Sequence, residues 1–196
     1  MLYLVRHGQT DWNLARRWQS RTDTPLNKTG YCQAQAMQRE FARRHLVFSR
    51  VLSSPLKRAR ETSRIIMGEL AETIETNEAL LEINLGDYEG RFESELRQEI
   101  GPDYDQWRHS RHRVAAPNGE SIFDVGKRVR PLLDSLDADS GPVLIVAHGG
   151  VHMAIKGTLS NCFSTDCLNA FHQNNNQIDL WATRPAALIE RIEVDI

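Results

Sequence analysis

The sequence predicts an α/β fold in which helices cover both faces of a mostly parallel central sheet, giving an α/β/α arrangement of three layers. Two short apolar runs, residues 2–5 and 143–147, carry this prediction, because neither alternates apolar with polar residues. Such runs are typical of strands buried on both faces, the usual state in a parallel sheet. Helical patterns lie between the expected strands, and this alternation favours a parallel sheet.

The composition is that of a globular protein. The chain has 196 residues, of which 40% are hydrophobic and 26% are charged. A chain of this length buries a sizeable core, so we expect one domain over residues 1–196. The net charge of -2 gives no basic field for nucleic acid. No apolar run approaches the ~20 residues that span a bilayer, and no secretory pattern opens the chain, so a cytoplasmic protein without membrane contact is expected.

The first half of the chain predicts a helix, a strand and a second helix. Apolar residues recur at helical spacing over residues 27–45, and residues 46–52 favour a strand. Ser54 followed by Pro55 predicts a helix start, with Ser54 as the N-cap and Pro55 as the first helical residue. This second helix is expected to run to about Leu70.

The second half is less regular at first. Gly and Pro residues break residues 82–120 into loops and short helices. A helix is expected over residues 121–136, although Pro131 should kink it or end it early. Another helix is expected over residues 151–159. Short strands are expected at residues 73–76, 177–181 and 187–194, the last of them at an edge of the sheet.

The three cysteines have no spacing typical of a metal site. Cys32, Cys162 and Cys167 are an odd number, with one loose C-x4-C between the last two. In a cytosolic protein such cysteines are expected as free thiols.

Histidine follows both apolar runs where each strand is expected to end. Arg6, His7 and Gly8 come after the first run, and His148 and Gly149 follow the later one. Because α/β sheets bind ligands beyond the carboxyl ends of their strands, we expect these groups at one site. Imidazole can attack phosphorus, and a guanidinium can clamp phosphate oxygens bidentately. The pattern indicates an anion site, although a surface turn explains either motif taken alone.

Arg58 and Glu82 add to this pattern. A cation near the first turn of a helix is unfavourable unless an anion lies beside it, and a phosphate there would also meet the free amides of the helix start. Glu82 lies in an apolar stretch, and partial burial suits a carboxyl to protonate a leaving oxygen. Taken singly, Arg58 fits a solvated basic helix face and Glu82 fits an exposed loop.

These residues belong to longer motifs with a fixed order along the chain. The opening motif is R-H-G-x-T-x-x-N, the second carries Arg58 in S-S-P-L-x-R-A-x-x-T, and the third begins at Glu82 as E-x-x-x-G-x-x-E-G. The matching stretches are residues 4–13, 23–26 with 29–30, 53–62, 82–90, 117–121 and 147–149.

This ordered set resembles the histidine phosphatase superfamily, the phosphoglycerate-mutase-like proteins. The resemblance spans about residues 1–150 and implies a phosphoglycerate-mutase-like fold. It implies that His7 is the nucleophile, that Glu82 is the general acid, and that no metal or cofactor is needed. A positive pocket around the phosphoryl group is implied from Arg6, Arg58 and a charged His148, which together would lower the pKa of His7. Further phosphate or substrate contacts are expected from Asn13, Gln19, Thr10 and Gly149.

Two positions favour a phosphatase over a mutase. The cofactor-dependent mutases that resemble this chain carry Arg directly after the catalytic Glu and Tyr two residues further on, whereas this chain has Ile83 and Leu85. We therefore predict a metal-independent phosphatase that hydrolyses a small phosphorylated metabolite through a phosphohistidine. The alternatives are a phosphoglycerate mutase and a non-catalytic protein that binds a phosphorylated ligand. The sequence leaves open both the substrate and the oligomeric state, monomer or homodimer.

Several further residues have two interpretations each. Residues 82–120 are expected to form a substrate-facing cap, in which the basic run 108–113 either binds a second anion or is a solvated surface. His152 stands at helical spacing from His148, but no third metal ligand is evident. Ser20 stands where the family often has Gly. Trp12 and Trp18 either line the mouth of the pocket or pack in the core.

Overall fold

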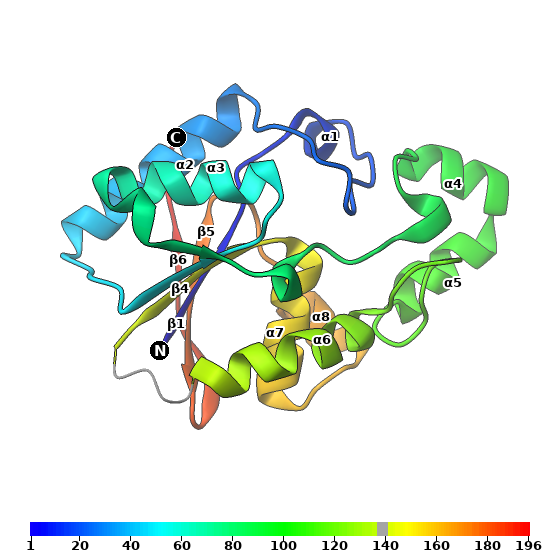
Figure 1. Cartoon of the computed structure of the whole chain (residues 1–196). Coiled ribbons are helices and arrows are strands. Elements are labelled where there is room, and N and C mark those ends of the chain that lie inside the picture. Colours follow the sequence, from blue (N-terminus) through cyan, green and yellow to red (C-terminus); the bar gives the residue numbers. More distant parts are fainter. Residues whose placement is uncertain (137–140) are drawn as a thin grey trace.

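A computed structural model describes residues 1–136 and 141–196 of the chain (Figure 1). Its centre is a sheet of six strands in the order β3-β2-β4-β1-β5-β6. The pairs β2–β3, β2–β4 and β1–β4 are parallel, while β5 is antiparallel to both β1 and β6. The predicted, mostly parallel sheet is thus confirmed. The strands are β1 (Leu2–Arg6), β2 (Arg50–Ser53), β3 (Ile74–Thr76), β4 (Val143–Ala147), β5 (Gln177–Thr183) and β6 (Ala186–Glu193).

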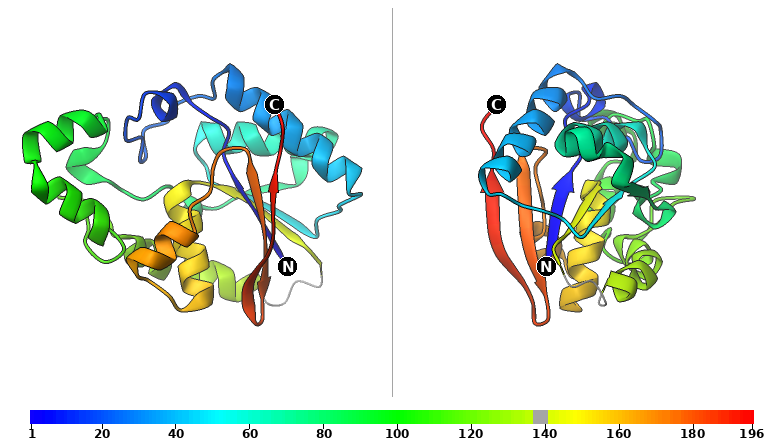
Figure 2. Two further views of the ribbon diagram at one scale, coloured as in Figure 1. Left: turned by 180° about the vertical axis from the view of Figure 1, so that it is seen from behind. Right: turned by 60° about the vertical axis from the view of Figure 1, so that its left-hand side comes forward.

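Helices cover both faces of the sheet, as predicted. Figures 1 and 2 show α2 and α3 on one face and α6 and α7 on the other. The α-helices are α1 (Asp11–Leu14), α2 (Lys28–Arg43), α3 (Lys57–Met67), α4 (Glu93–Ile100), α5 (Pro102–Ser110), α6 (Ile122–Ser135), α7 (Gly149–Ser160) and α8 (Thr165–Ala170). The 3-10 helices whose bounds lie within the described ranges are η1 (Gly68–Thr73), η2 (Glu78–Leu80) and η3 (Gly86–Tyr88).

The strand β1 is buried on both faces, which explains its unbroken apolar sequence. Leu2 and Leu4 belong to the core beneath α6 and α7, whereas Tyr3 and Val5 belong to the core beneath α2 and α3. Successive side chains of a strand point to opposite faces, so each face requires apolar residues at alternate positions. β4 divides in the same way, and together these strands hold the two helical layers.

Three parallel strands end at the same edge of the sheet. Arg6 at the end of β1 is paired in register with Ala147 at the end of β4, and Ser53 at the end of β2 is paired with Val146. The residues that follow these ends are therefore brought together. They are His7, His148 and the segment that leads into α3.

The start of α3 differs from the prediction. The helix begins at Lys57 rather than Pro55, and Ser54 does not cap it. The side chain of Asp23 accepts the Lys57 N–H at 2.7 Å, which supplies the cap from another part of the chain. The Ser54 hydroxyl instead lies 2.7 Å from the His148 ring, so a tertiary contact outweighs its capping preference.

The structure also corrects two element boundaries. β2 begins at Arg50, four residues later than the predicted strand. α6 continues through Pro131 to Ser135, so the expected early end is wrong. Pro131 is exposed and removes one hydrogen bond on the solvent side. Val129, Leu132 and Leu133 remain buried around it, and this packing holds the helix together.

Two of the three cysteines are paired. Cys162 and Cys167 form a disulfide between the end of α7 and α8, and Cys32 is free and exposed. The expectation of free thiols is wrong for this pair. Asn161 takes a left-handed conformation that ends α7, and the turn brings the two Cα atoms to 6.3 Å.

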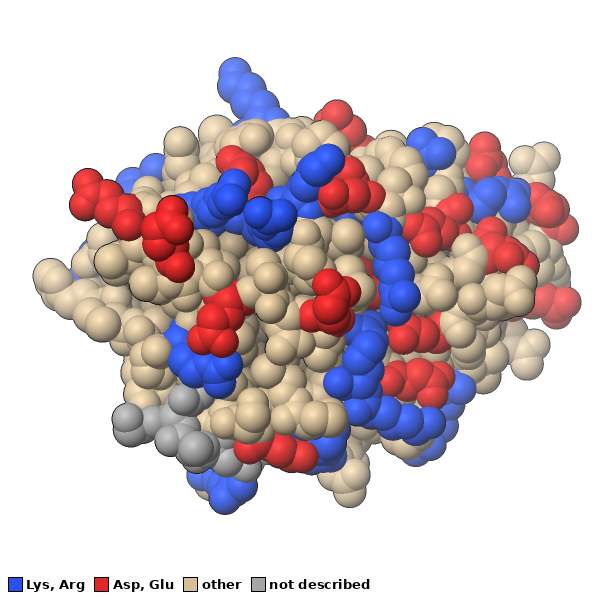
Figure 3. Space-filling view, viewed as in Figure 1, with Lys and Arg blue, Asp and Glu red and all other residues tan. Residues whose placement is uncertain are grey.

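The segment predicted as a cap contains α4 and α5, which project beside the sheet in Figure 1. Leu96, Tyr104 and Trp107 are buried and anchor the two helices to the core around Tyr88. The division into one domain with this cap stays a prediction. Acidic and basic side chains are intermixed on the face shown in Figure 3. Within the described ranges, none of the helices has the length and apolar character needed to cross a membrane.

Candidate active site

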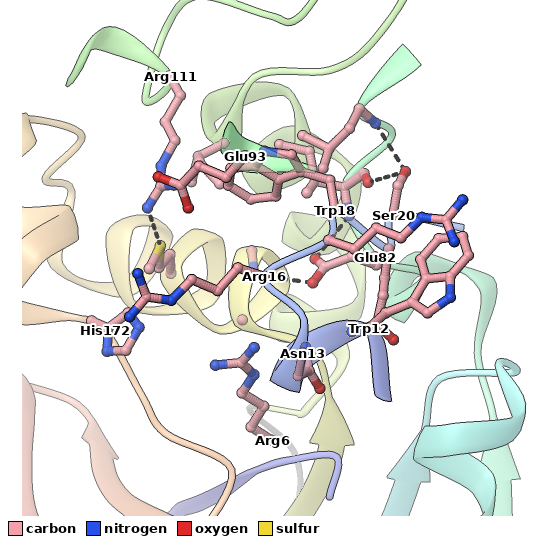
Figure 4. A pocket seen from close by; sticks show the side chains of 18 of the residues that line it. Arg6, Trp12, Asn13, Arg16, Trp18, Ser20, Glu82, Glu93, Arg111 and His172 are labelled. Atoms are coloured by element: carbon pink, nitrogen blue, oxygen red, sulfur yellow. Dashed lines mark hydrogen bonds between the residues drawn. The ribbon is translucent and has the colours of Figure 1, made fainter. Parts of the chain in front are cut away.

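A cavity of about 480 Å³ opens at the edge where β1 and β4 end (Figure 4). Its walls come from the strand ends, the segment around α1, the loop after η2 and the helix α5. Seven of the predicted site residues line it: Arg6, His7, Asn13, Gln19, Arg58, Glu82 and Gly149.

His7 has the geometry of a nitrogen nucleophile. Its side chain is buried, and Nδ1 lies 2.8 Å from the carbonyl oxygen of Gly8. A carbonyl only accepts, so Nδ1 carries the proton and Nε2 keeps its lone pair. Burial, followed by the charges of Arg58 and Arg6, holds the pKa of His7 well below 6.5. The imidazole is therefore neutral near neutral pH.

Arg58 and Arg6 are held in place by backbone carbonyls. Arg58 donates to the oxygens of Thr22 at 2.8 Å and Ser20 at 2.7 Å, and Arg6 donates to the oxygen of Gln173 at 2.9 Å. The Nε atoms of both arginines are buried, and neither has a hydrogen-bond partner among the described residues. Burial lowers the pKa of Arg58 to about 10, which leaves it charged at neutral pH. Two fixed cations arranged in this way are suited to bind an anion.

His148 lies beside His7, with 5.1 Å between the ring centroids. Its Nε2 contacts the Ser54 hydroxyl, and its Nδ1 is buried with no partner in the described part of the chain. Burial, then the charge of Arg58, holds the pKa of His148 well below 6.5. Burial next to Arg58 thus disfavours the charged form that is expected of His148 around a phosphoryl group. A bound phosphoryl dianion would favour that charged form again.

Glu82 is half-buried in the wall of the cavity. Its carboxylate accepts the N–H of Ile83 at 2.9 Å and that of Gly150 at 3.4 Å, at the start of α7. A Cβ atom on Gly150 would lie 2.6 Å from the Glu82 oxygen, so only glycine fits there. Gly149 lies against Arg6, but a Cβ there would meet its guanidinium carbon at 3.5 Å, an ordinary van der Waals contact.

Asn13 and Gln19 face the cavity, but Thr10 lies behind it. The Thr10 hydroxyl is fully buried and donates to the side-chain oxygen of Asn13, which together cap α1. Thr10 thus orients Asn13. Gln19 accepts the Thr24 hydroxyl at 2.6 Å.

Ser20, where the family often has Gly, takes a backbone conformation that favours glycine. Its φ of 49° lies in the left-handed region, which glycine adopts most easily. Its hydroxyl donates to the oxygen of Ile83 at 2.8 Å and accepts the N–H of Leu85 at 2.9 Å. The substitution therefore ties this loop to the segment that carries Glu82.

Sequence reasoning missed Gln173, which connects several parts of the site. Its side chain donates to the oxygens of Leu4 and Gln177, and its carbonyl accepts from Arg6. His152 donates from Nδ1 to its side-chain oxygen at 2.8 Å, so His152 supports Gln173 and does not pair with His148. No motif marked Gln173. Over the described ranges, no cluster of three or more His, Cys, Asp or Glu residues could hold a metal ion.

Two residues of the basic run 108–113 and both tryptophans line the cavity. Arg108 and Arg111 line it, as do Trp12 and Trp18. Within that run, the other residues lie outside the lining.

The buried histidines predict a marked loss of stability in acid. The pKa values of His7 and His148 lie well below 6.5, and burial, then the charge of Lys156, lowers that of His152 to about 3. Below about pH 6.5 the unfolded chain therefore binds protons that the folded chain does not. We expect the free energy of unfolding to be at its highest above that pH. On acidification it should fall by roughly 1.4 kcal/mol per pH unit for each imidazole.

Urea denaturation at several pH values between roughly 7.5 and 5.5 measures this slope. A His152→Gln variant should reduce the slope by about one imidazole. A free energy of unfolding that stays constant over this range would contradict the prediction.

The site so described sets two fixed guanidinium groups beside a neutral imidazole, an arrangement suited to an anion, on a mostly parallel α/β sheet. These are features of enzymes that transfer phosphoryl groups through histidine. The sequence profile of the histidine phosphatase superfamily (branch 1) matches residues 2–183, and the chain belongs to this family.

Curated and solved relatives agree with this assignment. "Probable phosphoglycerate mutase GpmB" of Yersinia pestis is 37% identical over 165 residues, which cover 81% of this chain and 74% of that protein. The mycobacterial glucosyl-3-phosphoglycerate phosphatase, solved in complex with VO3, superposes with a TM-score of 0.82 at 29% identity and covers 91% of this chain and 90% of its own. The alpha-ribazole phosphatase of Shigella flexneri has a TM-score of 0.81 at 26% identity, covering 95% and 93%.

Proposed function

We propose that the protein is a metal-independent phosphatase that hydrolyses a small phosphomonoester through a phosphohistidine at His7. The observation that carries the proposal is the neutral, oriented imidazole of His7 beside the buried guanidinium groups of Arg6 and Arg58. Two relatives with similar folds are named as phosphatases, and one of them was solved with VO3 and with inorganic phosphate.

The first half of the reaction forms the phosphoenzyme. His7 Nε2 attacks phosphorus, the bond from phosphorus to the ester oxygen breaks, and Glu82 gives its proton to the leaving alcohol. Arg6, Arg58 and a reprotonated His148 hold the three oxygens of the transferring group and balance its charge. Asn13 and Gln19 complete the cradle from the segment around α1.

The second half returns the enzyme to its starting state. The Glu82 carboxylate, now without its proton, takes a proton from water as that water attacks phosphorus. The bond between phosphorus and Nε2 breaks, inorganic phosphate leaves, and His7 is neutral again. Since every cation in the scheme is a protein side chain, a chelator should not reduce the rate.

Hydrolysis is favoured over mutase activity by the wall next to Glu82. Ile83 and Leu85 are buried and line the cavity at the positions where the mutases of the family carry Arg and Tyr. Apolar side chains there offer no hydrogen bonds to the carboxylate or phosphate of a phosphoglycerate. Mutase activity is the alternative function, because one relative is named as a probable phosphoglycerate mutase.

We expect the purified protein, treated with a chelator, to release inorganic phosphate from a panel of phosphomonoesters. Incubation with 3-phosphoglycerate should give glycerate and phosphate with little 2-phosphoglycerate, which an enolase-coupled assay measures. Rapid formation of 2-phosphoglycerate would instead support the mutase. Tight phosphate binding without turnover or a trappable phosphoenzyme would support a non-catalytic binding protein.

A further inference from the structure

The cavity carries more positive charge than one phosphoryl group needs. Six arginines and two carboxylates, Glu82 and Glu93, line it. Arg6 and Arg58 belong to the proposed phosphoryl site. The remaining four, Arg16, Arg17, Arg108 and Arg111, come from the segment after α1 and from the end of α5.

Two of these four arginines are already engaged. Arg108 forms an ion pair with Glu93, whose carboxylate also lies 3.5 Å from Arg97. Arg17 donates to the carbonyl of Gly90 and stacks over the ring of Trp12 at 4.0 Å. These contacts hold the guanidinium groups of Arg17 and Arg108 within the wall of the cavity.

Arg111 is a half-buried cation with no direct ion pair among the described residues, although the carboxylates of Glu82 and Glu93 act on it at longer range. Its guanidinium contacts the sulfur of Met153 at 3.9 Å, and a thioether is only a weak acceptor. Burial and the nearby charge of Arg108 lower its pKa, so the surroundings disfavour its charge. No carboxylate forms an ion pair with Arg111 in the described part of the chain, which leaves the guanidinium facing the cavity.

Arg16 and His172 lie on the same side of the cavity. Figure 4 shows the Arg16 side chain reaching toward His172, and the Arg111 side chain entering the same side of the cavity from another part of the wall. Within the described ranges, no ion pair engages the guanidinium of Arg16. His172 lines the same cavity, and burial, followed by the charges of Arg6, Arg111, Lys156 and Arg191, lowers its pKa.

We propose that Arg111 and Arg16 form a second anion subsite, and that the substrate is a small phosphomonoester with a further carboxylate or phosphate distal to the ester that is cleaved. This inference rests on the proposed phosphatase function and names the class of its substrate. The second anion would supply the charge that Arg111 lacks, and its guanidinium offers two parallel donors to either oxyanion.

Two matched pairs of compounds test the subsite and separate its two ligand sources. The carboxylate pair is 3-phosphoglycerate and glycerol 3-phosphate. The phosphate pair is 1,3-propanediol bisphosphate and its monophosphate. Within each pair the scissile ester is the same, and only the second anion differs. We expect the wild-type protein to show a kcat/KM higher by about 10-fold or more for the member that carries the second anion, in at least one pair.

Arg111→Met should remove most of this preference, mainly through KM, whereas Arg111→Lys should restore part of it. Arg113→Met is the control, because Arg113 belongs to the same basic run, lies over Phe123 and is outside the cavity lining. It should leave both the activity and the preference as in the wild type. Equal loss on both members of each pair in Arg111→Met, or no preference in the wild type, would overturn the subsite.

A binding measurement separates this proposal from the phosphatase itself. Calorimetry on the His7→Ala variant compares the affinity for the two members of each pair without turnover. Tighter binding of the member with the second anion, lost when Arg111→Met is added, would support the subsite even if the wild type failed to hydrolyse p-nitrophenyl phosphate. That failure would overturn the phosphatase alone, and equal affinity for both members would overturn the subsite alone.

Discussion

Replacing His7 with alanine is expected to lower phosphatase activity on the order of 10⁴-fold or more, the size of loss that follows removal of a catalytic nucleophile. The reason is that Nε2 of His7 forms the bond to phosphorus, and nothing else at the end of β1 replaces it. The hydrogen bond from Nδ1–H to the carbonyl of Gly8 and the low pKa of His7 both keep the lone pair of Nε2 free to attack. Release of phosphate from p-nitrophenyl phosphate measures the loss.

The same variant should form no phosphoenzyme. Labelling with a ³²P substrate, followed by an alkaline quench that preserves a bond between phosphorus and nitrogen, should mark the wild type and leave His7→Ala unlabelled. His109→Ala is a suitable control, because His109 is exposed on α5 and lies outside the cavity lining. An active His7→Ala enzyme, or one that still becomes labelled, would refute the proposed mechanism. Calorimetry with inorganic phosphate should show that Arg6 and Arg58 still bind an anion in the variant.

The second large effect is expected from Glu82→Gln, and its size should depend on the leaving group. An alkyl alcohol leaves only when it is protonated, so kcat/KM for an alkyl phosphate should fall by about 10²- to 10⁴-fold. p-Nitrophenolate leaves without a proton, so kcat/KM for its ester should change far less. Steady-state kinetics on the two classes of ester measure the difference.

Loss of Glu82 should also slow hydrolysis of the phosphoenzyme, because the carboxylate takes a proton from the attacking water. We expect a burst of p-nitrophenol followed by a slow steady state. Glu89→Gln is the matched control, since Glu89 comes from the same motif but accepts from Thr22 and lies outside the cavity lining. An equal loss of kcat/KM on both classes of ester would argue against Glu82 as the general acid.

Short-range sequence patterns predicted the parts of the fold that depend on local physics. The apolar runs that become β1 and β4 require two-sided burial, and the helix over 28–43 follows from its spacing and from its N-cap at Asn27. Ser54 was misassigned because its hydroxyl has two possible partners. Its capping preference is local, but the partner that it contacts, His148, is 94 residues away.

Electrostatic states could not be predicted from residue types. Composition and motif order indicate that His148 faces an anion, but its charge depends on how deeply it is buried. The structure places it with no exposed surface next to Arg58, and burial dominates. The same applies to Arg111, which fits a solvated basic residue in the sequence and becomes a half-buried cation only when the end of α5 places it against Met153 of α7.

The sequence by itself determined the family, the order of the strands along the chain and the chemical types gathered at the strand ends. These follow from residue patterns within a few positions of one another, and from motifs whose order is preserved. The tertiary structure alone decided which atoms are paired and which are left without a partner. In the folded chain Arg6 donates to the carbonyl of Gln173, Ser54 contacts His148, and Arg111 faces the cavity. These contacts join segments that are far apart in the sequence, so no local pattern predicts them.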